Sequence, residues 1–178
     1  IADPRIKTMQ KNLNLKVKFR ESFRPFAPAI MEDKLKEWFD INSISPYMLM
    51  IGYVKESKRI INSNSENFFG IEKLNQERSL VPAITHLDYS ARIQTVSKRT
   101  NNFFYQIIQN FYQDTGCPIL INTSFNVRGE PIVNTPKDAF NCFMGTNLDI
   151  LVVENYYLKK EEQNKSLFTN YKDKFELD

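Results

Sequence analysis

The segment spanning residues 101–121 is the strongest constraint on how this chain can fold. From Asn101 to Thr115, apolar residues recur at three- and four-residue spacing, which is typical of one buried helix face. Gly116 follows, and glycine often ends helices because it has no Cβ to oppose a left-handed conformation. The apolar residues 119–121 then predict a buried strand. We interpret the stripe as core; it comprises Phe103, Phe104, Ile107, Ile108, Phe111 and Tyr112.

Other helix and strand patterns alternate along the chain and predict an α/β domain. Asp3 is a candidate N-cap, with Pro4 at N1, and Thr135-Pro136-Lys137-Asp138 resembles a capping box. The polar segment 55–80 is predicted to be a long loop, either a lid or simply mobile. We predict helices at 5–18, within 31–40 and after Thr135, an extended segment at 26–30, and buried strands at 46–54 and 148–153.

The composition indicates one globular domain of 178 residues that is long enough to bury a core. No apolar run approaches the ~20 residues of a membrane-spanning helix, and no signal peptide is present. Cys117 and Cys142 have no paired spacing, which indicates reduced thiols and a cytoplasmic protein. The net charge of +3 fits an anionic small-molecule ligand, but it is too weak to indicate nucleic acid.

The loop after the strand at 119–121 is the first candidate site. Residues 122–130 concentrate hydroxyl and amide side chains around Arg128, with Gly129 beside it. Hydroxyls and amides bind phosphate oxygens, a guanidinium adds charge and two donors, and glycine allows close approach of the backbone. The sequence therefore predicts an oxyanion site in this loop.

Two further polar clusters could belong to the same site. Residues 16–24 are basic, although cations at the end of a helix can equally compensate its dipole. His86, Asp88, Ser90 and Arg92 alternate, so they share a face if the segment is extended, and that face could also be the solvated side of a sheet. For His86, the only histidine, a structural role is favoured over a ligand-binding or catalytic one.

Three segments together resemble the C-terminal part of the NodU/CmcH/TobZ family of O-carbamoyltransferases. They are residues 16–28, residues 85–96 and residues 122–133, in the family's order, and the resemblance covers residues 1–160. It implies a YrdC-like fold, an open twisted mixed sheet flanked by helices. The balanced charges at 161–178 separately predict a C-terminal tail, either a peripheral helix or a frayed terminus.

The resemblance also implies a longer protein. The opening residues 1–5 resemble the segment directly after a Gly-Pro-Arg-Ala-Leu-Gly-Asn-Arg-Ser motif of that family, so we expect a fragment rather than a tag remnant. An N-terminal, actin-like transferase domain, holding Fe²⁺ or a similar metal, is expected upstream and absent from this chain. It would pass the carbamoyl group to an acceptor hydroxyl in a biosynthetic process.

By the same resemblance, this domain would make carbamoyl-adenylate from ATP and carbamoyl phosphate, with Mg²⁺ accompanying ATP. The family signature, a Lys-x-Arg and a later Ser-x-Asn, corresponds to Lys18-Phe19-Arg20 and Ser124-Phe125-Asn126. Glu130 is expected to orient Arg128. The nucleotide-binding candidates are Lys18, Arg20, Asn122, Thr123, Ser124 and Asn126, and the candidates for carbamoyl phosphate and catalysis are Arg24, His86, Arg92 and Arg128.

One position departs from the family pattern. Tyr89 stands between Asp88 and Ser90 where the family has a glycine, so a left-handed backbone there would have to change. Two other functions stay open: a non-catalytic nucleotide- or RNA-binding module, and a purely structural partner of the transferase domain. Small-molecule substrates and the protein's own N-terminal domain are the expected partners, without membrane or nucleic acid.

Overall fold

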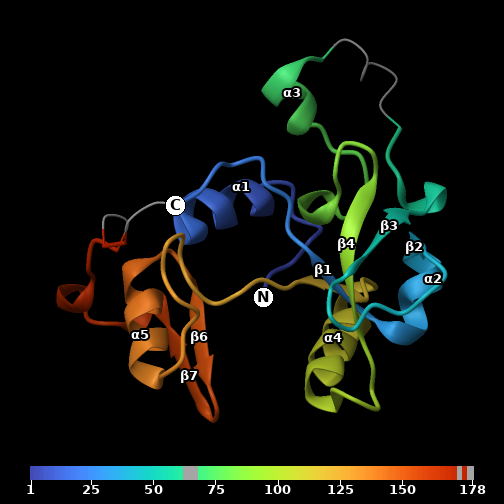
Figure 1. Ribbon diagram of the computed structural model, residues 1–178. Helices are drawn as coiled ribbons and strands as arrows, with labels where there is room; N and C mark the ends of the chain where they lie inside the picture. The colour runs from blue at the N-terminus through green and yellow to red at the C-terminus, as the bar shows by residue number, and fades with distance from the viewer. Residues whose placement is uncertain (62–67, 172–173, 176–178) are drawn as a thin grey trace. The chain divides into compact units, whose positions relative to one another are not determined.

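The computed structural model describes residues 1–61, 68–171 and 174–175 (Figure 1). The chain divides into two compact units. The first comprises residues 1–10 and 25–123, and the second comprises residues 11–24 and 124–178. Parts of the predicted 55–80 loop and of the tail lie outside the described residues.

A five-stranded mixed sheet forms the first unit, with strand order β2-β3-β4-β1-β5 (Figure 1). β1 runs parallel to β4 and antiparallel to β5, and β3 runs antiparallel to β2 and β4. This arrangement confirms the predicted mixed α/β class. The strands are β1 (Pro28–Met31), β2 (Phe39–Asp40), β3 (Met50–Val54), β4 (Ser90–Val96) and β5 (Ile119–Ile121), and the short helices are α2 (Leu35–Trp38) and α3 (Gly70–Leu74).

Helix α4 (Asn102–Thr115) covers one face of this sheet and begins and ends as predicted. The Asn101 side chain accepts the Phe104 N–H at 3.2 Å, and Gly116 adopts a φ of 71°. Phe103 is the exception in the predicted stripe, because it is 81% exposed. At 100° per residue it lies about 140° around the helix from buried Ile108. The core beneath α4 contains Ala29, Met31, Val96, Tyr105, Ile108 and Leu120.

The strand predicted at 46–54 is shorter and less buried than expected. β3 buries Gly52 and Val54, whereas Ile51 is 63% exposed and Tyr47, before the strand, is 80% exposed. Side chains of a strand alternate between its two faces, and only one face of β3 is covered. An apolar run does not by itself show that both faces are buried.

The predicted helix at 5–18 is divided and begins later. α1 (Met9–Leu13) continues directly into a π-helix (Asn14–Lys18), and residues before Met9 form turns. Asp3 is therefore not an N-cap of this helix. Its carboxylate instead accepts the backbone N–H of Arg5 at 2.9 Å and forms an ion pair with the Arg5 guanidinium at 2.7 Å.

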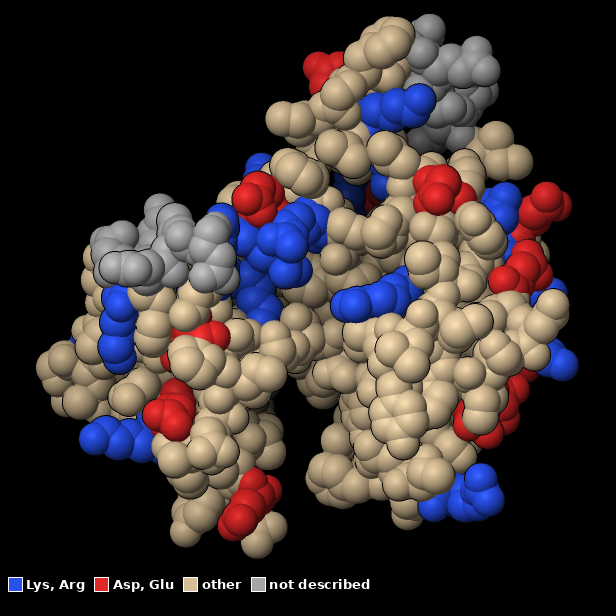
Figure 2. Space-filling model, in the orientation of Figure 1, with Lys and Arg blue, Asp and Glu red and all other residues tan. Residues whose placement is uncertain are grey.

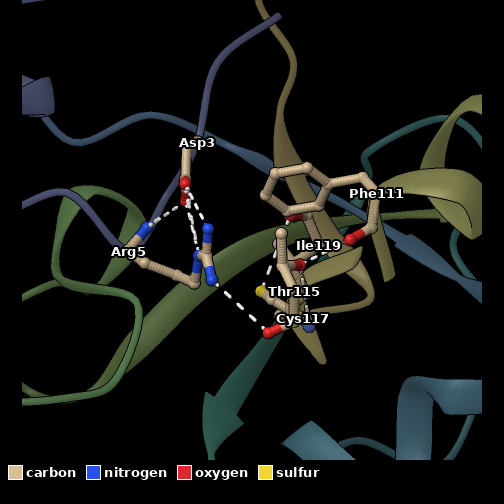
Figure 3. A network of polar contacts seen from close by, with 6 residues as sticks. All are labelled: Asp3, Arg5, Phe111, Thr115, Cys117 and Ile119. Atoms are coloured by element: carbon tan, nitrogen blue, oxygen red, sulfur yellow. Dashed lines mark hydrogen bonds and ion pairs between the residues drawn. The ribbon is translucent and has the colours of Figure 1, made fainter. Parts of the chain in front are cut away.

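Figure 3 shows the contacts that Asp3 and Arg5 make instead of joining the helix. Arg5 donates to the Thr115 carbonyl at 3.4 Å and lies 5.2 Å from the centroid of the Phe111 ring. The Thr115 hydroxyl in turn accepts the Cys117 N–H at 3.2 Å. The Asp3–Arg5 pair is thus attached to the junction of α4 and β5, which holds residues 2–5 against the sheet rather than in a helix.

The polar segment 55–80 contains more structure than a simple loop. Glu56–Lys58 is a 3₁₀ turn, and α3 lies near the other end. Buried Arg78 donates to the Lys73 and Leu74 carbonyls at 2.6 and 3.0 Å, which satisfies the C-terminal end of α3. Residues 62–67, in the middle of the expected lid, lie outside the described residues.

In the second unit, α5 (Pro136–Gly145) packs on a hairpin of β6 (Ile150–Val153) and β7 (Tyr156–Lys159) (Figure 1). The buried strand predicted at 148–153 corresponds to β6, but Val152 is 63% exposed. The reason is that a two-stranded hairpin has one face against α5 and the other uncovered.

The capping box predicted at the start of α5 is present. Thr135 Oγ1 accepts the Asp138 N–H at 3.1 Å, and the Asp138 carboxylate accepts the Thr135 N–H at 3.0 Å. We expect Thr135→Ala to lower the free energy of unfolding by ~1 kcal/mol, because the Asp138 N–H loses the Thr135 hydroxyl as its acceptor. Urea titration would measure this, and Thr100→Ala, at an exposed position, should leave the midpoint unchanged.

Both cysteines are buried free thiols, as predicted. Burial raises the pKa of Cys117 to about 11 and that of Cys142 to about 12, so both stay protonated and unreactive at neutral pH. Within the described ranges, none of the helices has the length and apolar character needed to cross a bilayer.

Candidate functional site

A basic pocket of about 310 Å³ opens on the second unit. Its wall combines the segment after the π-helix with the loop that follows β5, and it brings together six of the predicted site residues. Lys and Arg side chains also gather in a dense group on the face shown in Figure 2. The predicted residues in the wall are Lys18, Arg20, Arg24, Ser124, Asn126 and Arg128; Val127, Gly129, Glu130 and Pro131 complete it.

Lys18 organises one side of this pocket. Its side chain is only 5% exposed, and its ammonium group donates to the Ser124 carbonyl, to the Asn126 carbonyl at 2.9 Å and to Asn126 Oδ1 at 2.9 Å. The Lys18 carbonyl accepts the Arg128 N–H at 3.1 Å. Because an ammonium group has three donors, Lys18 is used mainly to hold the loop in place.

The loop itself is closed by its own hydrogen bonds. The Ser124 hydroxyl lies 2.7 Å from Asn126 Oδ1, and Asn126 Nδ2 donates to the Glu130 carbonyl at 2.7 Å. Gly129 has a φ of 75°, a conformation that favours glycine, and it allows the Glu130 N–H to bond to the Val127 carbonyl at 3.2 Å. The polar density noted in the sequence therefore builds a defined loop.

Asn14, which the sequence reasoning missed, fixes the other wall. It is fully buried at the start of the π-helix, and its Nδ2 donates to the Ser22 and Arg24 carbonyls at 3.1 and 2.8 Å. Its Oδ1 accepts Arg20 Nε at 2.6 Å. One side chain thus sets the path of residues 20–24 and the direction of Arg20. In the sequence, the one indication of this role is that Asn14 is a polar residue within the predicted helix at 5–18.

Glu21 connects two of the arginines. Its carboxylate oxygens lie 3.5 Å from Arg24 Nη1 and 3.5 Å from Arg128 Nη1. A hydrogen bond from its own backbone, together with the charges of Arg128 and Arg24, lowers the pKa of Glu21. The carboxylate beside Arg128 is therefore Glu21, whereas the carboxylate of Glu130, the expected orienting group, accepts the Val127 N–H at 2.9 Å.

The charge of Lys18 should make anion binding dependent on pH. Burial, with a contribution from Arg20, lowers the pKa of Lys18 to about 8. A bound anion favours the protonated amine and raises this pKa, so binding near pH 8.5 takes up a proton. We expect affinity for inorganic phosphate to fall by up to ~10-fold between pH 7 and pH 9. Calorimetry in buffers of different ionisation enthalpy would measure the uptake, which Lys18→Met should abolish.

The face predicted at 86–92 is only partly formed. In the first unit, residues 86–89 make a turn in which the Tyr89 N–H bonds to the His86 carbonyl at 3.0 Å, and β4 begins at Ser90. His86 and Asp88 therefore do not continue the strand face that carries Arg92. Asp88 Oδ1 accepts the Ser90 N–H at 3.0 Å. Partial burial lowers the pKa of His86, although the negative charge of Asp88 acts to raise it.

Tyr89 keeps the backbone conformation that the family glycine would allow. Its φ is 65°, in the left-handed region, and its ring lies 4.5 Å from the Arg59 guanidinium carbon. The substitution therefore does not require a different local backbone. The turn tolerates the left-handed tyrosine because Asp88 binds the following N–H and Arg59 covers the ring.

This turn gives a direct test of the backbone conformation. We expect Tyr89→Val to destabilise the protein by ~1–2 kcal/mol, because a β-branched side chain is strongly disfavoured at positive φ. Tyr89→Gly should stay within ~1 kcal/mol of the parent, since the strain it relieves offsets the lost contact with Arg59. Thermal unfolding of the two variants would show equal losses if the left-handed conformation were wrong.

Asn122 and Thr123 also belong to the first unit. Asn122 Nδ2 donates to Gln94 Oε1 at 2.7 Å, and Ala27 accepts the Asn122 N–H at 3.2 Å. Gln94 was missed in the sequence, although its place in the alternating polar positions of β4 could have indicated it. The Asn122 amide is thereby oriented by a neighbouring strand.

The sequence matches the carbamoyltransferase C-terminus family over residues 1–160. The chain belongs to this family. Among relatives, this family member is 52% identical over its full length to an uncharacterized protein of Synechocystis sp.. It is 40% identical to nodulation protein NolNO and 34% identical to nodulation protein U, both of Sinorhizobium fredii, over 90% and 77% of the chain. These matches confirm the resemblance noted in the sequence.

This carbamoyltransferase C-terminus spans 29%, 21% and 21% of the lengths of those three relatives. The family is thus established for the chain, and the activity of the whole protein is a separate question. The pocket of the second unit lies within the matched range, since all of its lining residues fall between 18 and 131.

Proposed function

We propose that this chain binds ATP and carbamoyl phosphate and forms carbamoyl-adenylate as the C-terminal domain of an O-carbamoyltransferase. The observation that carries the proposal is the pocket in which Lys18, Arg20, Arg24 and Arg128 surround the Ser124–Asn126 loop. Its volume of about 310 Å³ suits a small ligand, and its charge suits phosphates.

The reaction needs charge stabilisation more than a nucleophilic side chain. Carbamoyl phosphate and water give carbamate and phosphate; a carbamate oxygen then attacks the α-phosphorus of ATP, and pyrophosphate leaves. Negative charge builds on the departing phosphates, and preorganised cations and N–H donors stabilise it. The arginines of the pocket would supply that charge, and the loop held by Lys18 would supply fixed dipoles.

Mg²⁺ is expected to arrive with the nucleotide. Among the described residues there is no group of three or more His, Cys, Asp or Glu side chains placed to hold a metal ion. Mg²⁺ bound through ATP phosphates and water fits this donor set, since that ion commonly keeps several waters. It would neutralise phosphate charge. Transfer of the carbamoyl group to a hydroxyl is proposed for the N-terminal domain of the longer protein.

Pyrophosphate exchange tests the adenylation step. Labelled pyrophosphate should appear in ATP when carbamoyl phosphate is present, and Arg128→Ala should slow exchange by ~100-fold through loss of a charged contact. Lys137→Ala is the matched control, because Lys137 is exposed on α5 and outside the pocket. His86→Ala and Arg92→Ala measured in parallel would test the two candidates in the first unit.

Exchange should be assayed in the full-length protein as well as in this chain. Absence of exchange from the full-length protein would refute adenylation. Stoichiometric ATP binding that RNA displaces, without exchange, would instead favour the nucleic-acid-binding module. ATP binding that is insensitive to both Lys18→Ala and Ser124→Ala would show that the pocket is not the nucleotide site.

A further inference from the structure

The tail beyond the family match contributes a buried residue to the pocket unit. Tyr171 lies after residue 160, where the match ends, yet only 3% of it is exposed. It packs in one cluster with Val127 of the loop and Cys142 of α5. The tail was expected to be peripheral or frayed, and at this residue it is neither.

The fit between Tyr171 and α5 is tight. An added Cβ on Gly145 would lie 2.3 Å from Tyr171 Cβ and Cγ, so only glycine leaves room for the ring. The ring also meets Phe175 edge to face at a centroid distance of 5.3 Å. The position of the ring is therefore defined by the fold of the second unit.

The hydroxyl of Tyr171 reaches the loop through Glu130. It donates to Glu130 Oε1, while Glu130 Oε2 accepts the Val127 N–H at 2.9 Å. The Glu130 carbonyl accepts Asn126 Nδ2 at 2.7 Å. Both carboxylate oxygens are thus bound, and the residue they belong to closes the loop that presents Arg128.

Glu130 places a negative charge in the pocket wall, and the Tyr171 hydroxyl donates a hydrogen bond to it. It is a carboxylate in the wall of a pocket suited to phosphate, where a negative charge opposes the ligand. Hydrogen bonds from Tyr171 and Val127 stabilise that charge and hold it in one orientation. Burial, then the bond to Glu130, raises the pKa of Tyr171, so the hydroxyl remains a donor at neutral pH.

We propose that Tyr171 is a positioning residue for the anion site, acting through Glu130 on the 126–130 loop. The identity of the ligand as ATP rests on the function proposed above. The positioning does not, because it concerns contacts within the second unit. It makes the tail, outside the family-matched range, part of the working pocket.

The test separates the hydroxyl from the ring. Tyr171→Phe keeps the packing and should leave thermal unfolding close to that of the parent, while weakening ATP binding by ~10-fold and speeding hydrogen exchange at the Val127 amide by a similar factor. Tyr156→Phe is the matched control, because Tyr156 lies in the same unit and is 73% exposed. Calorimetry and amide exchange by NMR provide the two measurements.

Glu130→Gln tests whether Tyr171 acts through the Glu130 carboxylate. A tyrosine that only fills space would have the same effect on ATP affinity with Glu130 or with glutamine at position 130. In the Glu130→Gln background, Tyr171→Phe should lower ATP affinity by less than ~3-fold, whereas it should lower it by ~10-fold in the parent chain. Equal costs in the two backgrounds, or a Val127 exchange rate like that of Tyr156→Phe, would overturn the positioning role. If Tyr171→Phe does not fold, Glu130→Gln alone decides: unchanged Val127 exchange would overturn the proposal.

Failure of the two proposals can be told apart. If the parent chain binds no ATP but Tyr171→Phe still accelerates Val127 exchange, the positioning role stands and the proposed ligand is wrong. If the parent binds ATP and neither exchange nor affinity responds to Tyr171→Phe, the proposed function stands and the positioning role is wrong.

Discussion

Lys18→Met should weaken the proposed ATP binding by ~100-fold or more. The methionine side chain has a similar length but cannot donate to the Ser124 and Asn126 carbonyls or to Asn126 Oδ1. These acceptors would be left without their charged donor, and each charged hydrogen bond contributes ~1.5–3 kcal/mol. Calorimetric titration with ATP would give the affinity.

Stability provides the second measurement on Lys18. Burying the ammonium group opposes folding, whereas its bonds to the loop favour folding, so Lys18→Met should change the free energy of unfolding by less than ~3 kcal/mol. Lys16→Met, at an exposed position of the same π-helix, is the matched control. Equal ATP affinity in the two variants would contradict the role given to Lys18.

Asn14→Ala should destabilise the protein by ~3 kcal/mol and weaken ATP binding by ~10–100-fold. The alanine leaves the Ser22 and Arg24 carbonyls without their Asn14 donor and removes the acceptor that orients Arg20 Nε. The segment carrying Arg20 and Arg24 would then lose its defined path. Chemical denaturation and calorimetry would separate the loss of stability from the loss of affinity.

Asn134→Ala is the matched control for this experiment, because Asn134 is an exposed asparagine of the same unit. The affinity loss in Asn14→Ala should persist at temperatures where the variant is fully folded. If affinity recovered completely under those conditions, Asn14 would only support folding, and it would not direct Arg20.

Local sequence patterns predicted the elements that depend on neighbouring residues. The capping box at Thr135, the end of α4 at Gly116 and the extended form of β1 all depend on contacts within a few positions. Separately, the family resemblance, through its Lys-x-Arg and Ser-x-Asn signature, identified residues that line one pocket. The capping box and the helix end can be read from the sequence because their physical causes are short in range.

Patterns failed where contacts distant in sequence decide the outcome. Asp3 does not cap a helix because Arg5, held by Thr115 and Phe111, pairs with it in the turn that precedes the helix. The apolar residues of β3 do not reveal that one face of the sheet is uncovered, which leaves Ile51 exposed. Competing partners from elsewhere in the chain override local preference in both cases.

The sequence alone determined the class of fold, because periodicity carries that information, and its resemblance to a known family indicated most of the polar residues of the pocket. Only the tertiary structure showed how those residues are used. Lys18 holds a loop 106 residues away, Asn14 directs Arg20, and Tyr171 closes on Glu130. Burial makes each of these polar groups require a specific partner, and the fold alone determines which partner is within reach.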